Sequence, residues 1–159
     1  MIQLATHKFG VKFFITNPEA KPLKDFIPVF HGWIQRQALP GHLLIDVHDY
    51  SHVYQGPGIL LVAHEANISI DQSEGRPGLL YLRKRAPVPL PEIVAAARSA
   101  AQLLADEQGV QFDETGYELV CNDRLVNPNT DELAAILGVP VQRKPADPRA
   151  RATFWVALQ

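Results

Sequence analysis

Histidines and carboxylates are concentrated between residues 31 and 65, and these are the side chains in the sequence that could support catalysis or metal binding. Five of the six histidines fall in this stretch: His31, His42, His48, His52 and His64. Carboxylates are interleaved with them, namely Asp46, Asp49 and Glu65. Imidazole is the commonest metal ligand and the side chain whose charge changes near neutral pH. Catalysis or metal binding, if the protein performs either, is therefore expected here.

Residues 43–47 alternate as a strand does, which places Asp46 and His48 on one face together with Tyr50. The apolar side chains between them are expected to take the opposite, core face: Leu43, Ile45 and Val47.

One interpretation of the polar face is a metal or acid–base site. The candidate ligands for a divalent metal are Asp46, His48, His52 and His64, because imidazole and carboxylate suit zinc or iron. In the catalytic version, a hydrolase or lyase would use Asp46 and His48 with Glu65 as general base.

The simpler interpretation is an ordinary polar face of an antiparallel sheet, where alternation arises anyway. His64 shares strand parity with Leu60 and Val62, and a histidine on an apolar face usually bonds nearby backbone or a carboxylate. His64-Glu65 does not complete the zinc-protease motif, because Ile68 stands where the second histidine is needed.

No complete catalytic or nucleotide-binding motif occurs in the chain. The sequence lacks a Gly-x-Ser-x-Gly nucleophile elbow, a Gly-rich phosphate loop ending in Lys-Ser/Thr and a Rossmann glycine fingerprint. The single cysteine, Cys121, alternates with Tyr117 and Leu119, which predicts a buried and unreactive thiol.

The first half of the chain predicts one helix among strands. Phe26, Phe30 and Trp33 lie on one stripe of a helix that Asp25 caps and Pro40-Gly41 ends. Strands are predicted over residues 11–15, 43–47, 59–71 and 79–85, the third being either one long strand or two with a bulge.

The second half predicts a long helix over residues 91–108, which Gly109 ends. Strands are predicted over residues 117–121 and 153–158, with an irregular segment over 143–151. Asn129 and Glu132 have the spacing of a capping box that opens a short helix.

These elements predict the α+β class. Hairpin connections favour antiparallel pairing, so we expect a mostly antiparallel sheet of about six strands. Two main helices and one short helix pack on it. Helix–strand alternation in the second half leaves a three-layer α/β arrangement as the alternative. The length indicates one globular domain, residues 1–159.

Net charge and the distribution of apolar residues argue against some classes of function. The net charge of -2 argues against a general nucleic-acid binder. No apolar run is long enough to span a bilayer, and the first residues lack the features of a signal peptide. We therefore expect a soluble, cytoplasmic protein that acts without nucleic acid or membrane.

Three functions stay open. The first is a non-catalytic domain that binds a protein partner or forms a homodimer, because strand edges and aromatic side chains can pair across an interface. The aromatic candidates are Tyr54, Tyr81 and Trp155. The second is the metal- or histidine-dependent hydrolase or lyase. The third is a small-molecule pocket between helix and sheet, lined by Phe13, Phe30 and Trp33.

Overall fold

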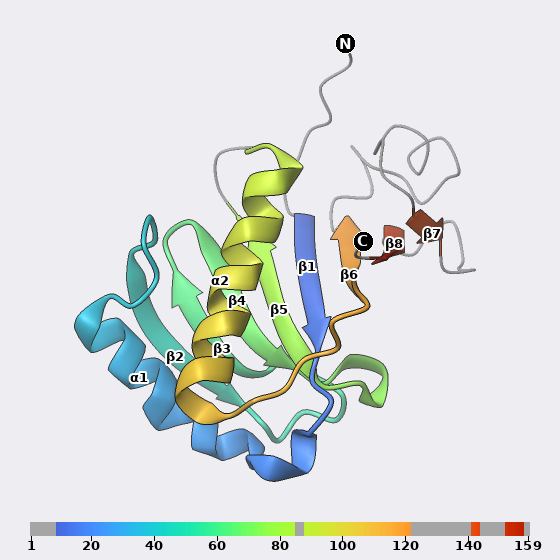
Figure 1. Cartoon of the computed structure of the whole chain (residues 1–159). Coiled ribbons are helices and arrows are strands. Elements are labelled where there is room, and N and C mark those ends of the chain that lie inside the picture. The colour runs from blue at the N-terminus through green and yellow to red at the C-terminus, as the bar shows by residue number, and fades with distance from the viewer. Residues whose placement is uncertain (1–8, 85–87, 122–140, 144–151, 158–159) are drawn as a thin grey trace.

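Strands dominate the computed structural model, which describes residues 9–84, 88–121, 141–143 and 152–157 (Figure 1). The strands are β1 (Phe9–Phe14), β2 (Leu44–Tyr50), β3 (Gly58–Ala63), β4 (Ala66–Asp71), β5 (Gly78–Arg83), β6 (Gly116–Cys121), β7 (Val141–Arg143) and β8 (Ala152–Ala157). The helices are α1 (Phe26–Arg36) and α2 (Leu90–Gln108), and the short 3₁₀ turns are η1 (Pro18–Ala20), η2 (Leu23–Asp25) and η3 (Ser73–Gly75).

The strands pair into one antiparallel sheet in the order β2-β3-β4-β5-β1-β6-β8-β7. This confirms the predicted α+β class with an antiparallel sheet. The described residues contain eight strands, more than predicted, partly because β7 occupies a segment with no strand signal. The predicted short helix near Asn129 lies outside the described residues.

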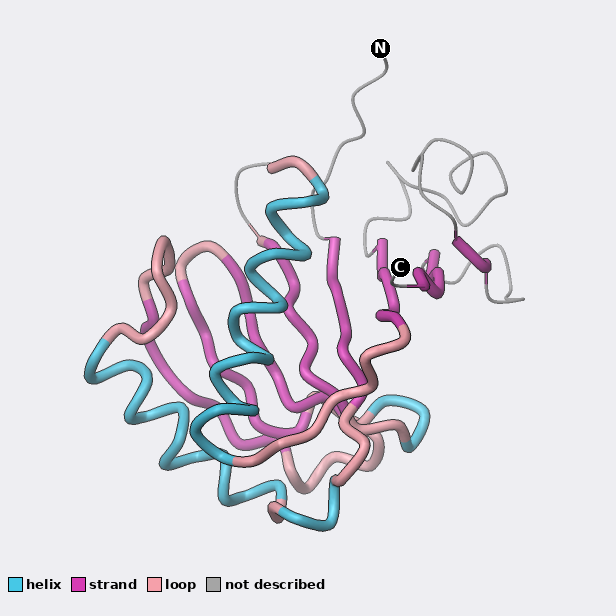
Figure 2. The backbone as a smooth tube through the Cα atoms, viewed as in Figure 1, coloured by secondary structure: helices cyan, strands magenta, loops and turns pink. Residues whose placement is uncertain are grey.

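Both helices pack against the same face of the sheet (Figure 2). Helix α1 contacts β2 and β3, whereas α2 contacts β1 and β5. The Trp33 indole N–H donates to the Glu107 carboxylate, which also pairs with Arg36, so α1 is tied to the end of α2. Gly109 ends α2 in the left-handed conformation, as predicted. Neither described helix is long and apolar enough to cross a membrane.

The core lies between this face and the helices. Strand residues of one parity supply it, for example Val11, Tyr81 and Ile68, whose Cα atoms are opposed across neighbouring strands. Phe30 and Trp33 from α1 are fully buried there. Their burial makes them core residues, in line with an apolar helical stripe that faces a sheet.

The segment over residues 59–71 differs from both predicted forms. It is a hairpin, because β3 ends at Ala63 and β4 begins at Ala66, with His64 and Glu65 as the connecting turn. In β4, Ile68 and Ile70 are buried in the core, and their polar neighbours Ser69 and Asp71 are buried as well.

At the start of β2, two of the three apolar side chains predicted to face the core are exposed instead. Leu43 and Ile45 are 56% and 53% exposed, whereas Leu44 is 3% exposed. The cause is a shift of the β2–β3 register between Leu44 and Asp46, which inserts one extra residue and reverses the parity before it. Only Val47 of the three predicted core residues packs against the core.

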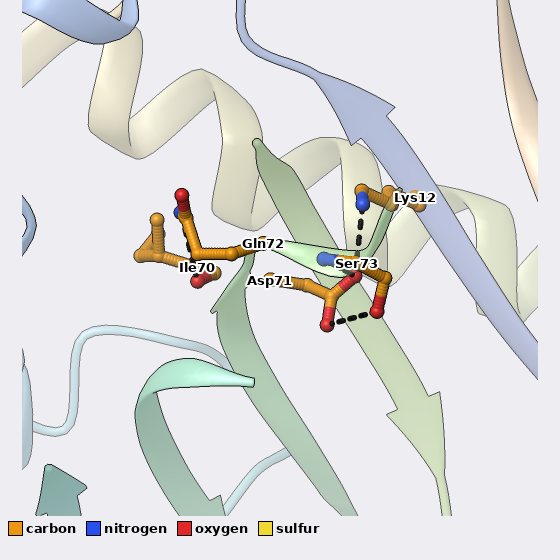
Figure 3. Close-up of polar contacts among 5 residues, drawn as sticks. All are labelled: Lys12, Ile70, Asp71, Gln72 and Ser73. Carbon is orange, nitrogen blue, oxygen red and sulfur yellow. Dashed lines mark hydrogen bonds and ion pairs between the residues drawn. The ribbon is translucent and has the colours of Figure 1, made fainter. Parts of the chain in front are cut away.

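A buried ion pair lies on the second face of the sheet, opposite the helices. Lys12 Nζ of β1 lies 2.8 Å from Asp71 Oδ2 of β4, and the side chains are 4% and 8% exposed (Figure 3). Strand β5 lies between them, and Lys12 crosses it at Gly78, where a Cβ would lie 2.7 Å from Lys12 Cε. Ser73 donates from its hydroxyl and its backbone N–H to the same carboxylate.

Removing the cation of this pair should destabilise the fold. Lys12→Met leaves the Asp71 charge buried without its partner, and we expect the free energy of unfolding to fall by about 3–5 kcal/mol. The double variant Lys12→Met/Asp71→Asn has no buried charge and keeps a side chain that can bond Ser73, so most of the loss should be recovered. Urea unfolding of both variants measures this. A double variant less stable than the single would contradict it.

Candidate functional site

The predicted site residues of β2 share one face. His48 Nε2 lies 3.6 Å from Asp46 Oδ2, and the side chains are 47% and 60% exposed. The His48 ring stacks on Tyr50 with 6.2 Å between centroids and 15° between planes. This is the second face of the sheet, because Asp46 and His48 are opposed to Val62 and Leu60 of β3. Solvent reaches both groups, so the pair has the environment of a surface contact.

His52 lies in the hairpin between β2 and β3, apart from this pair along the strand. It is exposed, and it has a small lowering effect on the pKa of Asp49. Hydrogen bonds from the Ser51 hydroxyl and backbone N–H hold the pKa of Asp49 below its ordinary value. These contacts are turn chemistry, in which Asp bonds a backbone N–H two residues on.

Glu65 and His64 lie at the other end of β2, in the turn between β3 and β4. Leu43 donates its backbone N–H to Glu65 Oε1 at 2.9 Å, and Leu44 is opposed to Ala63. His64 is exposed, so the expectation that it lies on an apolar face is wrong; the strand ends one residue before it.

Electrostatics keep the Glu65 carboxylate ionised. Partial burial raises its pKa, but hydrogen bonds from the N–H groups of Leu43 and Glu65, with the nearby His42 and His64, outweigh this. The pKa therefore lies below the ordinary value of 4.5. The hydrogen bond from the Leu43 N–H to Glu65 holds the start of β2 in place. This structural contact accounts for the lowered pKa of Glu65 without a contact to a substrate.

A polar cluster that the sequence pattern does not indicate surrounds the Tyr81 hydroxyl. His42 Nε2 lies 2.6 Å from this oxygen, and Arg83 donates to it at 3.3 Å. Burial raises the pKa of Tyr81, against a smaller lowering by Arg83. The His42 ring also meets the Tyr81 ring edge-on. In the sequence, Tyr81 lies in an apolar run and is typical of a core residue. The one indication of this cluster is its hydroxyl, which needs a hydrogen-bond partner when it is buried.

The four predicted metal ligands lie in three separate parts of the structure. Asp46 and His48 are together, His52 is in the hairpin, and His64 is in the next turn. Throughout the part of the chain that the structure describes, no three His, Cys, Asp or Glu side chains are grouped so that they could hold a metal ion. The metal site and its catalytic version stay predictions.

All three residues predicted to line a small-molecule pocket, Phe13, Phe30 and Trp33, are buried in the core. Phe13 also borders a groove of about 780 Å³ between α2 and residues 109–114. Arg98 lines the groove as well. The binding of a small molecule stays a prediction.

Apolar exposure is concentrated on β2 and its hairpin. Among the described residues, the exposed large hydrophobic side chains are Leu43, Ile45, Tyr50, Val53 and Tyr54, the last being 88% exposed. Tyr54 is exposed as predicted. Tyr81 is buried, which corrects its assignment as an interface aromatic, because it lies on the core parity of β5. Trp155 is partly buried and stacks on Phe14.

Comparison with known proteins and structures identifies no similar protein. The chain matches no protein-family model, no curated protein and no solved structure.

The Glu65 contact gives a pH-dependent prediction. A carboxylate with a depressed pKa in the folded state stabilises the fold above its unfolded pKa, and this contribution is lost as the pH falls through the folded pKa. At pH 7 we expect Glu65→Ala to lose about 1 kcal/mol of unfolding free energy with the Leu43 hydrogen bond. Glu65→Gln keeps an acceptor and should lose less.

Urea unfolding at neutral and acidic pH tests this. The difference between the wild type and Glu65→Gln should shrink as the pH falls below 4.5, the ordinary value for this group. A difference that stayed constant with pH would show that the carboxylate charge does not act at this turn.

Proposed function

We propose that this chain is a non-catalytic assembly domain that associates through the edge strand β2, as a homodimer. The observation that carries the proposal is the gathering of exposed apolar side chains on residues 43–54. Scattered exposed hydrophobic residues are normal on a protein surface, but here all of those described lie at the two ends of one edge strand or in the hairpin after it, and concentrated apolar exposure is typical of an interaction surface. The proposed interaction is strand addition, in which a partner strand continues the sheet.

The position of β2 supports strand addition. It is the first strand of the sheet order, so only β3 is hydrogen-bonded to it among the described strands. An edge strand of this kind presents N–H and C=O groups that a new strand can use. β2 runs over seven residues and contains no Lys and no Pro, the residues that commonly protect an edge. β7, the strand at the other end of the order, has three residues.

The Val47 N–H marks the outward side of β2. It donates to Asp46 Oδ1 at 2.8 Å. The Asp46 side chain is 60% exposed, so its carboxylate lies on the solvent side of the strand and not between β2 and β3. The Val47 N–H therefore points to the edge and is the donor that an added strand would meet. Loss of this donor should prevent pairing but leave the β2–β3 ladder in place.

Val47→Pro removes this donor and tests the proposal. Proline is tolerated on an edge strand where its nitrogen faces solvent, so the chain should still fold. We expect the wild type to change from monomer to dimer in sedimentation velocity as its concentration rises, and Val47→Pro to stay monomeric. Val47→Thr keeps the N–H and the β-branched shape, so it is the matched control and should dimerise.

Circular dichroism and thermal melting establish that both variants are folded. Two results would overturn the proposal: a wild-type chain that stays monomeric at the highest concentration reached, or a folded Val47→Pro variant that dimerises as the wild type does.

A further inference from the structure

We infer that the partner strand is β2 of a second copy, paired antiparallel about a two-fold axis at Val47, with Asp46 of each copy opposite His48 of the other. This inference rests on the proposed function and adds to it the register and the recognition contact. It assigns a role to the Asp46–His48 pair, to which the described residues add no third side chain that could complete a metal site.

The register follows from symmetry and charge. Directly opposed residues of an antiparallel pair lie on the same face, and side chains alternate along a strand. A two-fold axis perpendicular to the sheet therefore passes midway between a residue and the same residue of the second copy, and it is named here by that residue. An axis at Asp46 opposes two carboxylates, and an axis at His48 opposes two imidazoles. An axis at Val47 opposes two apolar side chains and sets Asp46 against His48 twice.

Axes at the positions flanking this central segment, Asp49 and Ile45, are also disfavoured. An axis at Asp49 again opposes two carboxylates. An axis at Ile45 lies at the register shift between Leu44 and Asp46, where the edge is irregular. Like charges directly opposite disfavour a sheet, whereas an imidazole N–H opposite a carboxylate can donate a hydrogen bond to it. Val47 is therefore the centre that the sequence of β2 favours.

Antiparallel pairing also covers the exposed apolar side chains. Leu43 and Ile45 are at the start of β2, whereas Tyr50, Val53 and Tyr54 are at its end and in the hairpin. About an axis at Val47, the start of one strand lies beside the end of the other. Leu43 and Ile45 of one copy are therefore brought near Tyr50 of the other, and this contact occurs twice.

Each edge polar group has a hydrogen-bond partner on association: the Leu44 N–H and carbonyl stay bonded to the Gln37 side chain, and the Val47 N–H exchanges one acceptor for another. In the isolated chain the Val47 N–H donates to the Asp46 carboxylate, which also lies near His48 of its own strand. In the dimer the Val47 N–H donates to a carbonyl of the other β2, and the released carboxylate turns to His48 across the axis. A two-fold contact of this kind closes on itself, so the product is a dimer and not a fibre.

Charge variants test the register. His48→Asp makes the β2 face acidic at both positions, and the double variant Asp46→Lys/His48→Lys makes it basic at both. Either variant alone opposes like charges across the axis twice. We expect the dimerisation constant of each to weaken by at least about tenfold relative to the wild type. An equimolar mixture pairs Asp with Lys at all four positions and should form a heterodimer at least as tight as the wild-type dimer.

Native mass spectrometry separates the three dimers by mass, and sedimentation gives their affinities. The heterodimer should dominate at low salt and lose part of its advantage at high salt, because these charges are exposed. Ser99→Lys, an exposed site on α2, is the control for added charge away from β2 and should dimerise as the wild type does.

The possible results separate this inference from the proposed function. If both charge variants dimerise like the wild type and show no preference for each other, the register is wrong, whereas a monomeric Val47→Pro still supports association through β2. If the wild type and the mixture both stay monomeric, the register and the homodimer fall together. If Val47→Pro dimerises unchanged, association uses another surface and this inference is overturned.

Discussion

The register shift at the start of β2 determines what this protein presents to other molecules. One extra residue between Leu44 and Asp46 turns Leu44 into the core and leaves Leu43 and Ile45 exposed. Without it, strict alternation would bury Leu43 and Ile45, as the sequence pattern alone predicts. Gln37 accommodates the shift, because its side chain accepts from the Leu44 N–H and donates to the Leu44 carbonyl, while Glu65 accepts from Leu43. A strand whose apolar residues face outward at a sheet edge is suited to pairing.

The rest of the sheet gives this edge a rigid base. β1 is buried along its whole length, and β5 and β6 pair on either side of it. Lys12 and Asp71 connect β1 with β4 across Gly78, so the second face is fixed by an ion pair as well as by packing. On the first face, α1 is held over β2 and β3 and tied to α2 through Glu107. β2 is therefore supported by its own ladder and by α1, and it needs no partner to be ordered.

Local patterns predicted most of the fold, and the exceptions have physical causes. The two helices followed from their apolar stripes and from Gly109, and the antiparallel class followed from the hairpins. The turn at His64-Glu65 was missed because it contains no Gly or Pro, and a strand-like pattern follows it directly. β7 is too short to give a periodic signal. Asp46 and His48 were placed on one face by alternation, but the distance of Glu65 from them depends on strand register, which a sequence pattern does not specify.

The most direct measurement of the central claim is amide hydrogen exchange at Val47 as the protein concentration is raised. Val47 donates to a solvent-exposed carboxylate in the isolated chain, so its amide should exchange quickly when the protein is dilute. If β2 pairs with a second copy, the protection of this amide should rise with concentration, whereas amides of the buried strand β1 should not change. Unchanged, fast exchange at Val47 across the whole concentration range would contradict assembly through this edge.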